Sequence, residues 1–214
     1  MAKISDVAKN FAEGTKVVVR GKLSYCRYMT TVLDGADLEQ EIKREEQYST
    51  HPEYILRDPK LRFTIVEPKM IKQGEKPNDL EIAFSKKIYK TKDGEKRLDY
   101  QRKAPKNKSG EFFIPYIFGV KQENGKIKKI DLAGKDLDNN QMVTLTYSVY
   151  ETKKGLKGLD LSTIVFDEEP KLYQRHSTLP DGWEDSDDDK DDGTSAATEG
   201  IEGIPFEDND VFDD

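Results

Sequence analysis

The stretch MVTLTYSVYETKKGLKGLDLSTIVF, residues 142–166, has the clearest periodicity in the chain. In its first half Val143, Leu145 and Tyr147 share one parity with polar residues between them, and in its second half Leu159 and Leu161 do the same. Strict alternation of this kind is typical of a half-buried β-strand. Lysines and a glycine separate the halves, so the stretch predicts two successive strands joined by a turn.

The same signals recur toward the N-terminus. About seven strands are predicted, at residues 15–28, 61–66, 80–90, 112–121, 127–132, 142–150 and 159–165. Gly21 inside the first of them indicates a bulge or a bend, and Asn124-Gly125 indicates a hairpin turn. One clear helix is expected at residues 34–48, where strong helix formers occur without proline, and the first 14 residues have apolar spacing for a helical turn or two.

These elements predict an all-β fold with one or two helices, most naturally an elaborated five-stranded OB-fold barrel followed by a disordered acidic tail. We expect the barrel domain to cover residues 1–169 and the tail to cover residues 170–214. The segment from Glu184 onward is acidic, small and low in complexity, so it buries too little apolar surface to offset the entropy of ordering.

Charge is divided unevenly along the chain. The whole sequence has 42 acidic and 35 basic residues, a net of −7. Eighteen of the acidic residues but only three basic ones lie from Asp167 to the end, so this part is −15 and the preceding residues are +8. A basic body on the same chain as an acidic tail indicates that the body binds a polyanion and that the tail competes for that surface or recruits a partner.

The sequence also excludes several classes of protein. Its one cysteine, Cys26, permits no intrachain disulfide and no thiolate zinc site, which fits a reducing cytoplasm. No apolar run approaches the ~18 residues of a membrane span, and the first residues lack the apolar stretch of a signal peptide. We therefore expect a cytoplasmic protein without a membrane partner.

The densest positive stretch, residues 86–108, interleaves basic residues with tyrosines. Single-stranded nucleic acid calls for this mixture, because cations neutralise phosphates and flat rings stack on unpaired bases. The predicted phosphate contacts are Lys86, Lys87, Lys90, Arg97, Arg102, Lys103, Lys106 and Lys108, and the predicted stacking residues are Tyr89, Tyr100 and Tyr116, with Tyr28 behind them. Tyr25, Arg27 and Tyr28 form a second candidate set near the first strand.

Signals for catalysis are weak, and we expect a protein that is not an enzyme and uses no cofactor or metal. The two histidines, His51 and His176, have no recognisable nucleophile partner. One pattern leaves an alternative open: Asp58, Glu67 and Lys69 have a spacing that Mg²⁺-dependent nucleases use. A second alternative is an acidic DNA mimic or inhibitor whose tail occupies a partner's nucleic-acid site.

The chain resembles phage-type single-stranded DNA-binding proteins. The segment AGKDLDNNQMVTLTYSVYETKKGLKGLDLSTIVFDEE, residues 133–169, is similar to the last two barrel strands of that family, and a Lys/Tyr-rich segment precedes it. The acidic C-terminal part adds a third likeness. Within it, Gly203-Ile204-Pro205-Phe206 resembles the Asp-x-Ile-Pro-Phe end of bacterial single-stranded DNA-binding proteins, although here eight residues follow the phenylalanine.

This resemblance implies an OB-fold protein that coats and protects single strands during DNA replication, recombination and repair in a phage-infected bacterial cell. It implies that the tail occupies the DNA groove when DNA is absent and contacts replication proteins such as a polymerase, a helicase-primase or a nuclease. The predicted docking residues in the tail are Ile204, Pro205, Phe206, Val211 and Phe212. A homodimer is a further implication, for which the sequence shows no interface.

Overall fold

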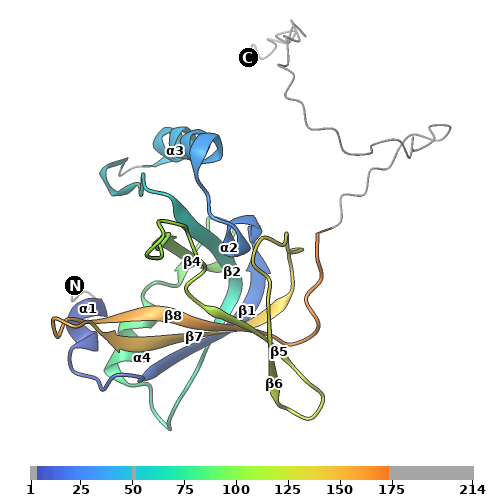
Figure 1. Ribbon diagram of the computed structural model, residues 1–214. Coiled ribbons are helices and arrows are strands. Elements are labelled where there is room, and N and C mark those ends of the chain that lie inside the picture. Colours follow the sequence, from blue (N-terminus) through green and yellow to red (C-terminus); the bar gives the residue numbers. More distant parts are fainter. Residues whose placement is uncertain (1–3, 50–51, 174–214) are drawn as a thin grey trace, which may run out of the picture. The chain divides into compact units, whose positions relative to one another are not determined.

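The computed structural model describes residues 4–49 and 52–173, which form one mostly β unit with a few short helices (Figure 1). The eight strands are β1 (Lys16–Ser24), β2 (Lys60–Ile71), β3 (Tyr89–Lys90), β4 (Lys96–Lys103), β5 (Ile117–Lys121), β6 (Ile127–Ile130), β7 (Met142–Glu151) and β8 (Lys157–Phe166). The helices are α1 (Ile4–Ala8), α2 (Arg27–Thr30), α3 (Gly35–Tyr48) and α4 (Asp79–Ser85), with a 3₁₀ turn at Pro52–Tyr54. The prediction of a mostly β protein with few helices is confirmed.

The strands form a single sheet in the order β3-β4-β2-β1-β7-β8-β5-β6. All neighbours are antiparallel except β5 and β8, which pair in parallel. The alternation in β7 buries Val143, Leu145 and Tyr147, as the sequence predicts. β1 lies in the middle of the sheet, with β2 and β4 on one side and β7 and β8 on the other.

The prediction of a five-stranded closed barrel is wrong in its strand number and in its closure. The sheet has eight strands, and within residues 4–49 and 52–173 no ladder pairs β4 with β8. β4 and β8 nevertheless run in the same direction, and the guanidinium of Arg102 on β4 is hydrogen-bonded to the carboxylate of Asp160 on β8. The two strands therefore meet at a seam that is closed by side chains and not by backbone hydrogen bonds.

Gly21 lies at a β-bulge, as its place in the sequence suggests. Between Arg20 and Lys22 the register with β2 shifts, so that Glu67 and Pro68 together oppose this one glycine. Glu67 takes a left-handed backbone conformation with φ of 50°. A Cβ atom on Gly21 would collide with the fully buried side chain of Ile65 and would lie 2.9 Å from the Val66 carbonyl oxygen and 3.2 Å from the Pro68 Cα. The bulge thus admits only a residue without a side chain, and it lets β2 continue past a proline.

We expect Gly21→Ala to lower the free energy of unfolding by about 1–3 kcal/mol, because the added methyl group overpacks against backbone that cannot rotate away. Urea denaturation with the full chain measures this loss. Gly119→Ala is the matched control, since its Cβ would meet mainly the side chain of Ile127, which is 61% exposed and free to move. Equal losses in the two variants would contradict the bulge argument.

An aromatic cluster fills the core next to the seam. Tyr100 of β4 stacks on Phe63 of β2 with ring centroids 4.9 Å apart. Tyr116 meets Tyr100 edge to face at 5.9 Å and Phe118 at 5.4 Å. Such edge-to-face and offset pairs stabilise a core beyond their buried area, so these rings fix the position of β4 against β2 and β5.

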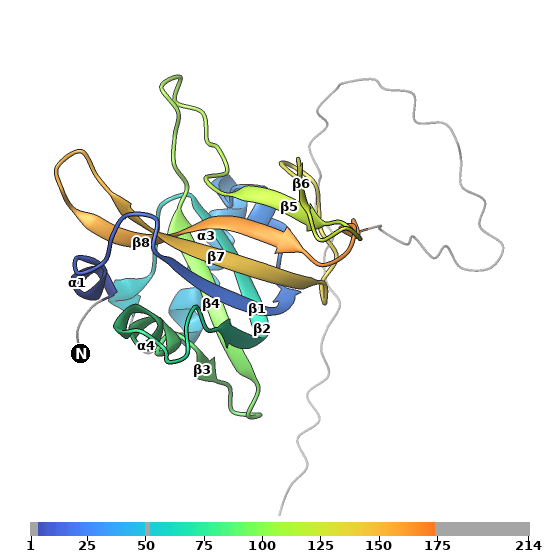
Figure 2. The same cartoon turned by 90° about the horizontal axis from the view of Figure 1, so that it is seen from below.

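The basic region differs most from the sequence prediction. Residues 80–90, predicted as a strand, form α4 followed by the short strand β3. A capping box explains the helix, because Asn78 accepts from the backbone of Glu81 while the Glu81 carboxylate accepts from the backbone of Asn78. Strand β4 lies where the sequence shows only a basic loop. Of the predicted strand at residues 112–121, only Ile117–Lys121 is a strand, and residues 104–116 form a long loop that extends away from the sheet (Figure 2).

Helix α3, close to its predicted limits, is attached to the sheet mainly by charge. Leu38 is its one buried residue. Its carboxylates instead face β2, where the fully buried ammonium of Lys60 lies 3.0 and 3.1 Å from the two carboxylate oxygens of Glu45 and 3.1 Å from the Leu56 carbonyl. Arg62 bonds to both Glu41 and Glu45. No helix within the described ranges is long and apolar enough to span a membrane.

The boundary predicted at residue 169 stays a prediction. The described chain continues four residues beyond it, and Leu172 makes an isolated β-bridge with Leu137. In the same segment the backbone NH of Tyr173 donates to the carbonyl of Asp136.

Candidate nucleic-acid interface

One row of residues crosses four strands on the outer surface of the sheet. Register places Lys22 of β1 opposite Val66 of β2, Val66 opposite Arg97 of β4, and Arg97 opposite Tyr89 of β3. Directly paired residues lie on the same face of a sheet. Lys22 is exposed, Arg97 is half-buried, and Tyr89 is 43% exposed, so two cations and an aromatic ring share one face.

Tyr25 adds a second ring beside this row. It follows directly after β1, has φ of 50° and is 60% exposed. The guanidinium of Arg97 is paired with Glu95, whose carboxylate oxygen lies 2.6 Å from its Nε, and this hydrogen bond raises the pKa of Arg97. We call the set Lys22, Tyr25, Val66, Tyr89 and Arg97 the outer row.

Hydrogen bonds hold the Tyr89 ring in place. Its hydroxyl donates to Asp99 over 2.8 Å, and the hydroxyl of Thr64 donates to the other oxygen of the same carboxylate over 2.7 Å. Partial burial and the Asp99 carboxylate raise the pKa of Tyr89 to about 12, so the phenol is neutral at physiological pH. A ring fixed by its hydroxyl loses little entropy when a base stacks on it.

The seam between β4 and β8 contains a cavity of about 290 Å³, which we call the seam pocket. Its side chains come from α4's C-terminal end, β4, β7 and β8. The lining residues are Lys87, Leu98, Asp99, Tyr100, Gln101, Arg102, Tyr147, Tyr150, Leu159 and Asp160. Two of the predicted phosphate contacts, Lys87 and Arg102, therefore meet here. Tyr150 contributes a ring that is 45% exposed.

A second cavity of about 610 Å³ adjoins the seam pocket, because Arg102 lines both. Lys103 and Lys106 line it as well, together with Asp58 and Phe112. The ammonium of Lys103 is 2.7 Å from Asp58, and that of Lys106 lies 4.6 Å from the centroid of the Phe112 ring. Along β4, Arg97 and Lys103 share the outer face, whereas Arg102 has the opposite parity and lines the seam pocket and this cavity.

The remaining predicted cations lie apart from these cavities. Lys86 follows α4, Lys90 is in β3, and Lys108 is in the loop at residues 104–116; all three are exposed. Tyr28 belongs to α2, where its hydroxyl donates to Asp37 and the Arg27 guanidinium lies 5.1 Å from its ring centroid.

Two predicted stacking residues are core residues, which corrects their proposed role. Tyr100 is 7% exposed and Tyr116 is 4% exposed, so neither ring presents a face to a base. The Tyr100 ring is covered by Phe63, and the Tyr116 hydroxyl donates to the Met29 carbonyl over 2.6 Å. Burial raises the pKa of both hydroxyls. Their aromatic character serves the core between β2, β4 and β5.

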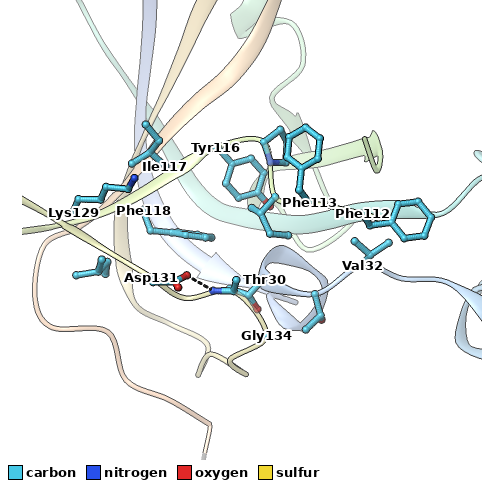
Figure 3. A pocket seen from close by; sticks show the side chains of 15 residues that line it. Thr30, Val32, Phe112, Phe113, Tyr116, Ile117, Phe118, Lys129, Asp131 and Gly134 are labelled. Carbon is cyan, nitrogen blue, oxygen red and sulfur yellow. Dashed lines mark hydrogen bonds between the residues drawn. The ribbon is translucent and has the colours of Figure 1, made fainter. Parts of the chain in front are cut away.

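The largest of the cavities described here, about 790 Å³, has different walls and a different chemistry (Figure 3). It is formed by α2, the end of the loop before β5, and the residues around β6. Phe113 and Ile117 at its edge are 44% and 50% exposed. Lys129 and Asp131 are its charged residues, and Asp131 accepts a hydrogen bond from the backbone of Ala133. This cavity favours apolar contact over phosphate binding.

The residues of the suspected nuclease pattern do not converge. Asp58 precedes β2, whereas Glu67 lies seven residues after the first residue of β2, about 23 Å along an extended strand at ~3.3 Å per residue. A Mg²⁺ ion requires its ligands at about 2.1 Å, so these carboxylates cannot share one. Among the described residues no cluster of three or more His, Cys, Asp or Glu side chains is arranged to hold a metal. Burial raises the pKa of the Cys26 thiol to about 11, so it is not a thiolate ligand at neutral pH.

Sequence reasoning missed two members of the interface. Lys22 and Tyr150 lie in strands, where each reads as an ordinary outward-facing residue. Lys22 gains a cationic neighbour only through the register across β1, β2 and β4. Tyr150 joins the basic residues Lys87 and Arg102 only because β4 meets β8 at the seam pocket. The predicted docking residues Ile204, Pro205, Phe206, Val211 and Phe212 lie outside the described residues.

Comparisons with known proteins add no assignment: no protein-family model matches this chain, and neither do the curated proteins or the solved structures.

Proposed function

We propose that this protein binds single-stranded DNA without strong sequence preference, coats it during replication or recombination, and is not an enzyme. The observation that carries the proposal is the outer row, in which Lys22, Arg97 and the exposed Tyr89 ring lie on one face of β1, β4 and β3, with the exposed ring of Tyr25 just after β1. Cations along a backbone track and rings that accept any base are the requirements for binding a single strand of any sequence.

The strand order supports an OB-type fold for the body. β1, β2 and β4 form an antiparallel meander, and β7 lies on the other side of β1, followed by β8. An OB barrel has this order and closes by parallel contact between its third and fifth strands. Here β4 and β8 correspond to the third and fifth strands, and they meet in parallel through side chains at the seam. The parallel backbone ladder to β8 is formed by β5. The outer row then lies on the face of the second and third barrel strands, with which OB folds bind nucleic acid.

The charge distribution supports a role for the C-terminal part. Residues up to Phe166 carry a net charge of +8 and the rest of the chain −15. We propose that the acidic segment competes with DNA for the basic surface and that Phe206 and Phe212 contact replication proteins. The acidic segment is tethered to the basic body, so its local concentration at the basic surface is high. Because salt screens the attraction between them, the competition with DNA is strongest at low salt.

Fluorescence anisotropy with a labelled oligo-dT of about 30 nucleotides tests this function. The full chain and a chain ending at Tyr173 are titrated over a salt series, with duplex DNA as competitor. We expect salt-dependent binding that prefers single strands and becomes tighter in the shorter chain. Absence of binding by both chains refutes the function, whereas equal affinity of the two at low salt refutes only the competition by the tail.

Exchanging Lys22 and Arg97 together for alanine is expected to reduce the steepness of the salt dependence. Each neutralised phosphate contributes about 0.7 to the slope of log K against log salt concentration. Loss of two contacts therefore lowers the slope by roughly 1.4. The control is the double exchange of Lys9, exposed just after α1, and Lys43, exposed on α3, which changes the net charge equally. The same drop in both variants would show that net charge alone, and not the outer row, determines the slope.

A further inference from the structure

The seam pocket combines a polar lining with a strand edge that has no ladder partner. β4 pairs with β3 only at Lys96 and Arg97, so within the described chain its edge from Leu98 to Lys103 faces β8 without backbone pairing. A volume of about 290 Å³ is at the lower limit of small-molecule sites. The pocket is thus large enough for one flat heterocycle and its sugar, but not for a larger ligand.

The hydroxyl of Tyr100 gives this pocket an unused polar group. Tyr100 is 7% exposed, and its hydroxyl oxygen is buried without a hydrogen-bond partner among the described residues. A buried polar group in this state costs folding free energy. Tyr100 lines the seam pocket together with Arg102, Asp160 and Tyr147. Burial and the Asp160 carboxylate raise the pKa of its hydroxyl, whereas the Arg102 guanidinium lowers it by its charge and by approaching the hydroxyl without completing a hydrogen bond. The nearby guanidinium of Arg102 is hydrogen-bonded to Asp160.

Two cations stand at the same pocket. The ammonium of Lys87 lies 5.8 Å from the centroid of the Phe84 ring, and burial lowers its pKa although Asp160 acts in the opposite direction. No ion pair of Lys87 occurs within the described residues, so a phosphate could bind it without displacing a carboxylate. Arg102 makes one hydrogen bond to the Asp160 carboxylate, and a phosphate can take the place of that carboxylate as the acceptor.

We propose that the seam pocket takes up one unstacked base of the bound single strand. The proposal rests on the proposed DNA-binding function and names a subsite of it. The Tyr150 ring stacks against the base. Lys87 and Arg102 bind the two phosphates that flank it, and Arg102 gives up its hydrogen bond to Asp160 when it binds its phosphate. The Tyr100 hydroxyl then reaches the edge of the base.

This arrangement agrees with binding of any sequence. A tyrosine hydroxyl both donates and accepts, and its hydrogen atom rotates to suit the partner. It therefore pairs equally well with the carbonyl oxygen of thymine or guanine and with the amino group or ring nitrogen of adenine or cytosine. An asparagine or an arginine at this place would discriminate between bases.

The test compares Tyr100→Phe with Tyr116→Phe, two changes that each remove one buried hydroxyl from the same cluster. Tyr100→Phe removes a hydroxyl without a protein partner, so we expect an unchanged or higher melting temperature together with 2- to 10-fold weaker binding of an oligo-dT of about ten nucleotides, the loss of one hydrogen bond. Tyr116→Phe removes the 2.6 Å hydrogen bond to Met29, so we expect a lower melting temperature and unchanged affinity of the folded protein. Unchanged affinity of Tyr100→Phe overturns the proposal.

Photo-crosslinking locates the base directly. An oligo-dT carrying single 5-iododeoxyuridines is irradiated with the full chain, and the attached residues are identified by mass spectrometry. A crosslink at Tyr150 or Tyr100 supports the seam pocket. Crosslinks confined to Tyr89 and Tyr25 overturn it but leave DNA binding by the outer row intact. An oligonucleotide that does not bind at all refutes the function and the subsite together.

Discussion

Replacing Glu45 with alanine is expected to lower the free energy of unfolding by about 3–5 kcal/mol, although Glu45 lies on a surface helix. Its carboxylate is the counter-ion of Lys60, whose side chain is fully buried between β2 and α3. Without Glu45 the side-chain nitrogen of Lys60 keeps one hydrogen bond, to the Leu56 carbonyl, and loses its counter-ion in a desolvated position. Chemical denaturation followed by circular dichroism measures the loss.

Two further variants separate this explanation from a general loss of helix. Glu46→Ala removes a neighbouring carboxylate that pairs with the exposed guanidinium of Arg57, and it is expected to change stability by less than about 1 kcal/mol. In a Glu45→Ala protein, Lys60→Met should restore most of the stability, because the two sites then bury no unpaired charge. A double variant no more stable than Glu45→Ala would contradict the role of the buried ammonium.

Replacing Tyr89 with alanine is expected to weaken binding of oligo-dT by about 1–3 kcal/mol, or roughly 5- to 150-fold in Kd. The ring is half exposed, lies beside Arg97 and is anchored by its hydroxyl to Asp99. The loss should arise from stacking, so it should be much smaller for an oligonucleotide that carries abasic sites in place of thymidines. Anisotropy with both ligands measures the difference.

The control for the ring is Tyr89→Phe, which loses the hydrogen bond to Asp99 but keeps the stacking surface. We expect a loss of affinity well below that of Tyr89→Ala, because the ring remains and only its anchoring hydrogen bond is removed. Tyr48→Ala removes a tyrosine that is 77% exposed at the end of α3, outside the outer row, and should have no effect. If Tyr48→Ala and Tyr89→Ala weaken binding equally, exposed tyrosines contact DNA wherever they lie on the protein, and the outer row is not the interface.

The sequence predicted those parts of the fold that depend on local pattern. The alternating strands β7 and β8, the glycine bulge in β1 and the helix α3 can be recognised from neighbouring residues. The prediction fails at α4, because its apolar residues Leu80, Ile82 and Phe84 alternate like those of a strand while the capping box at Asn78 sets a helix. It also fails at β4, whose charged residues conceal a strand that only its pairing with β2 stabilises.

The candidate site was predicted by composition but not by geometry. A lysine- and tyrosine-rich segment indicates nucleic-acid binding, yet the pattern does not tell a buried ring from an exposed one. Tyr89 and Tyr100 differ in this respect because β4 pairs with β2 along one edge, which turns Tyr100 inward onto Phe63, whereas Tyr89 lies on the outermost strand. Such differences arise from contacts between segments far apart in the chain.

The bulge at Gly21 has a consequence for the opposite side of the sheet. β1 is the strand that two halves of the sheet share, one running through β2 and β4 to β3 and the other through β7 and β8 to β5 and β6. A bulge increases the local twist of its strand, so the angle at Gly21 and Glu67 sets how far the two halves curl toward each other. The width of the gap between β4 and β8 therefore depends on the twist at the bulge in β1 and β2, on the opposite side of the sheet. A small rotation at this one point, carried across two strands on either side, would widen or narrow the mouth of the seam pocket.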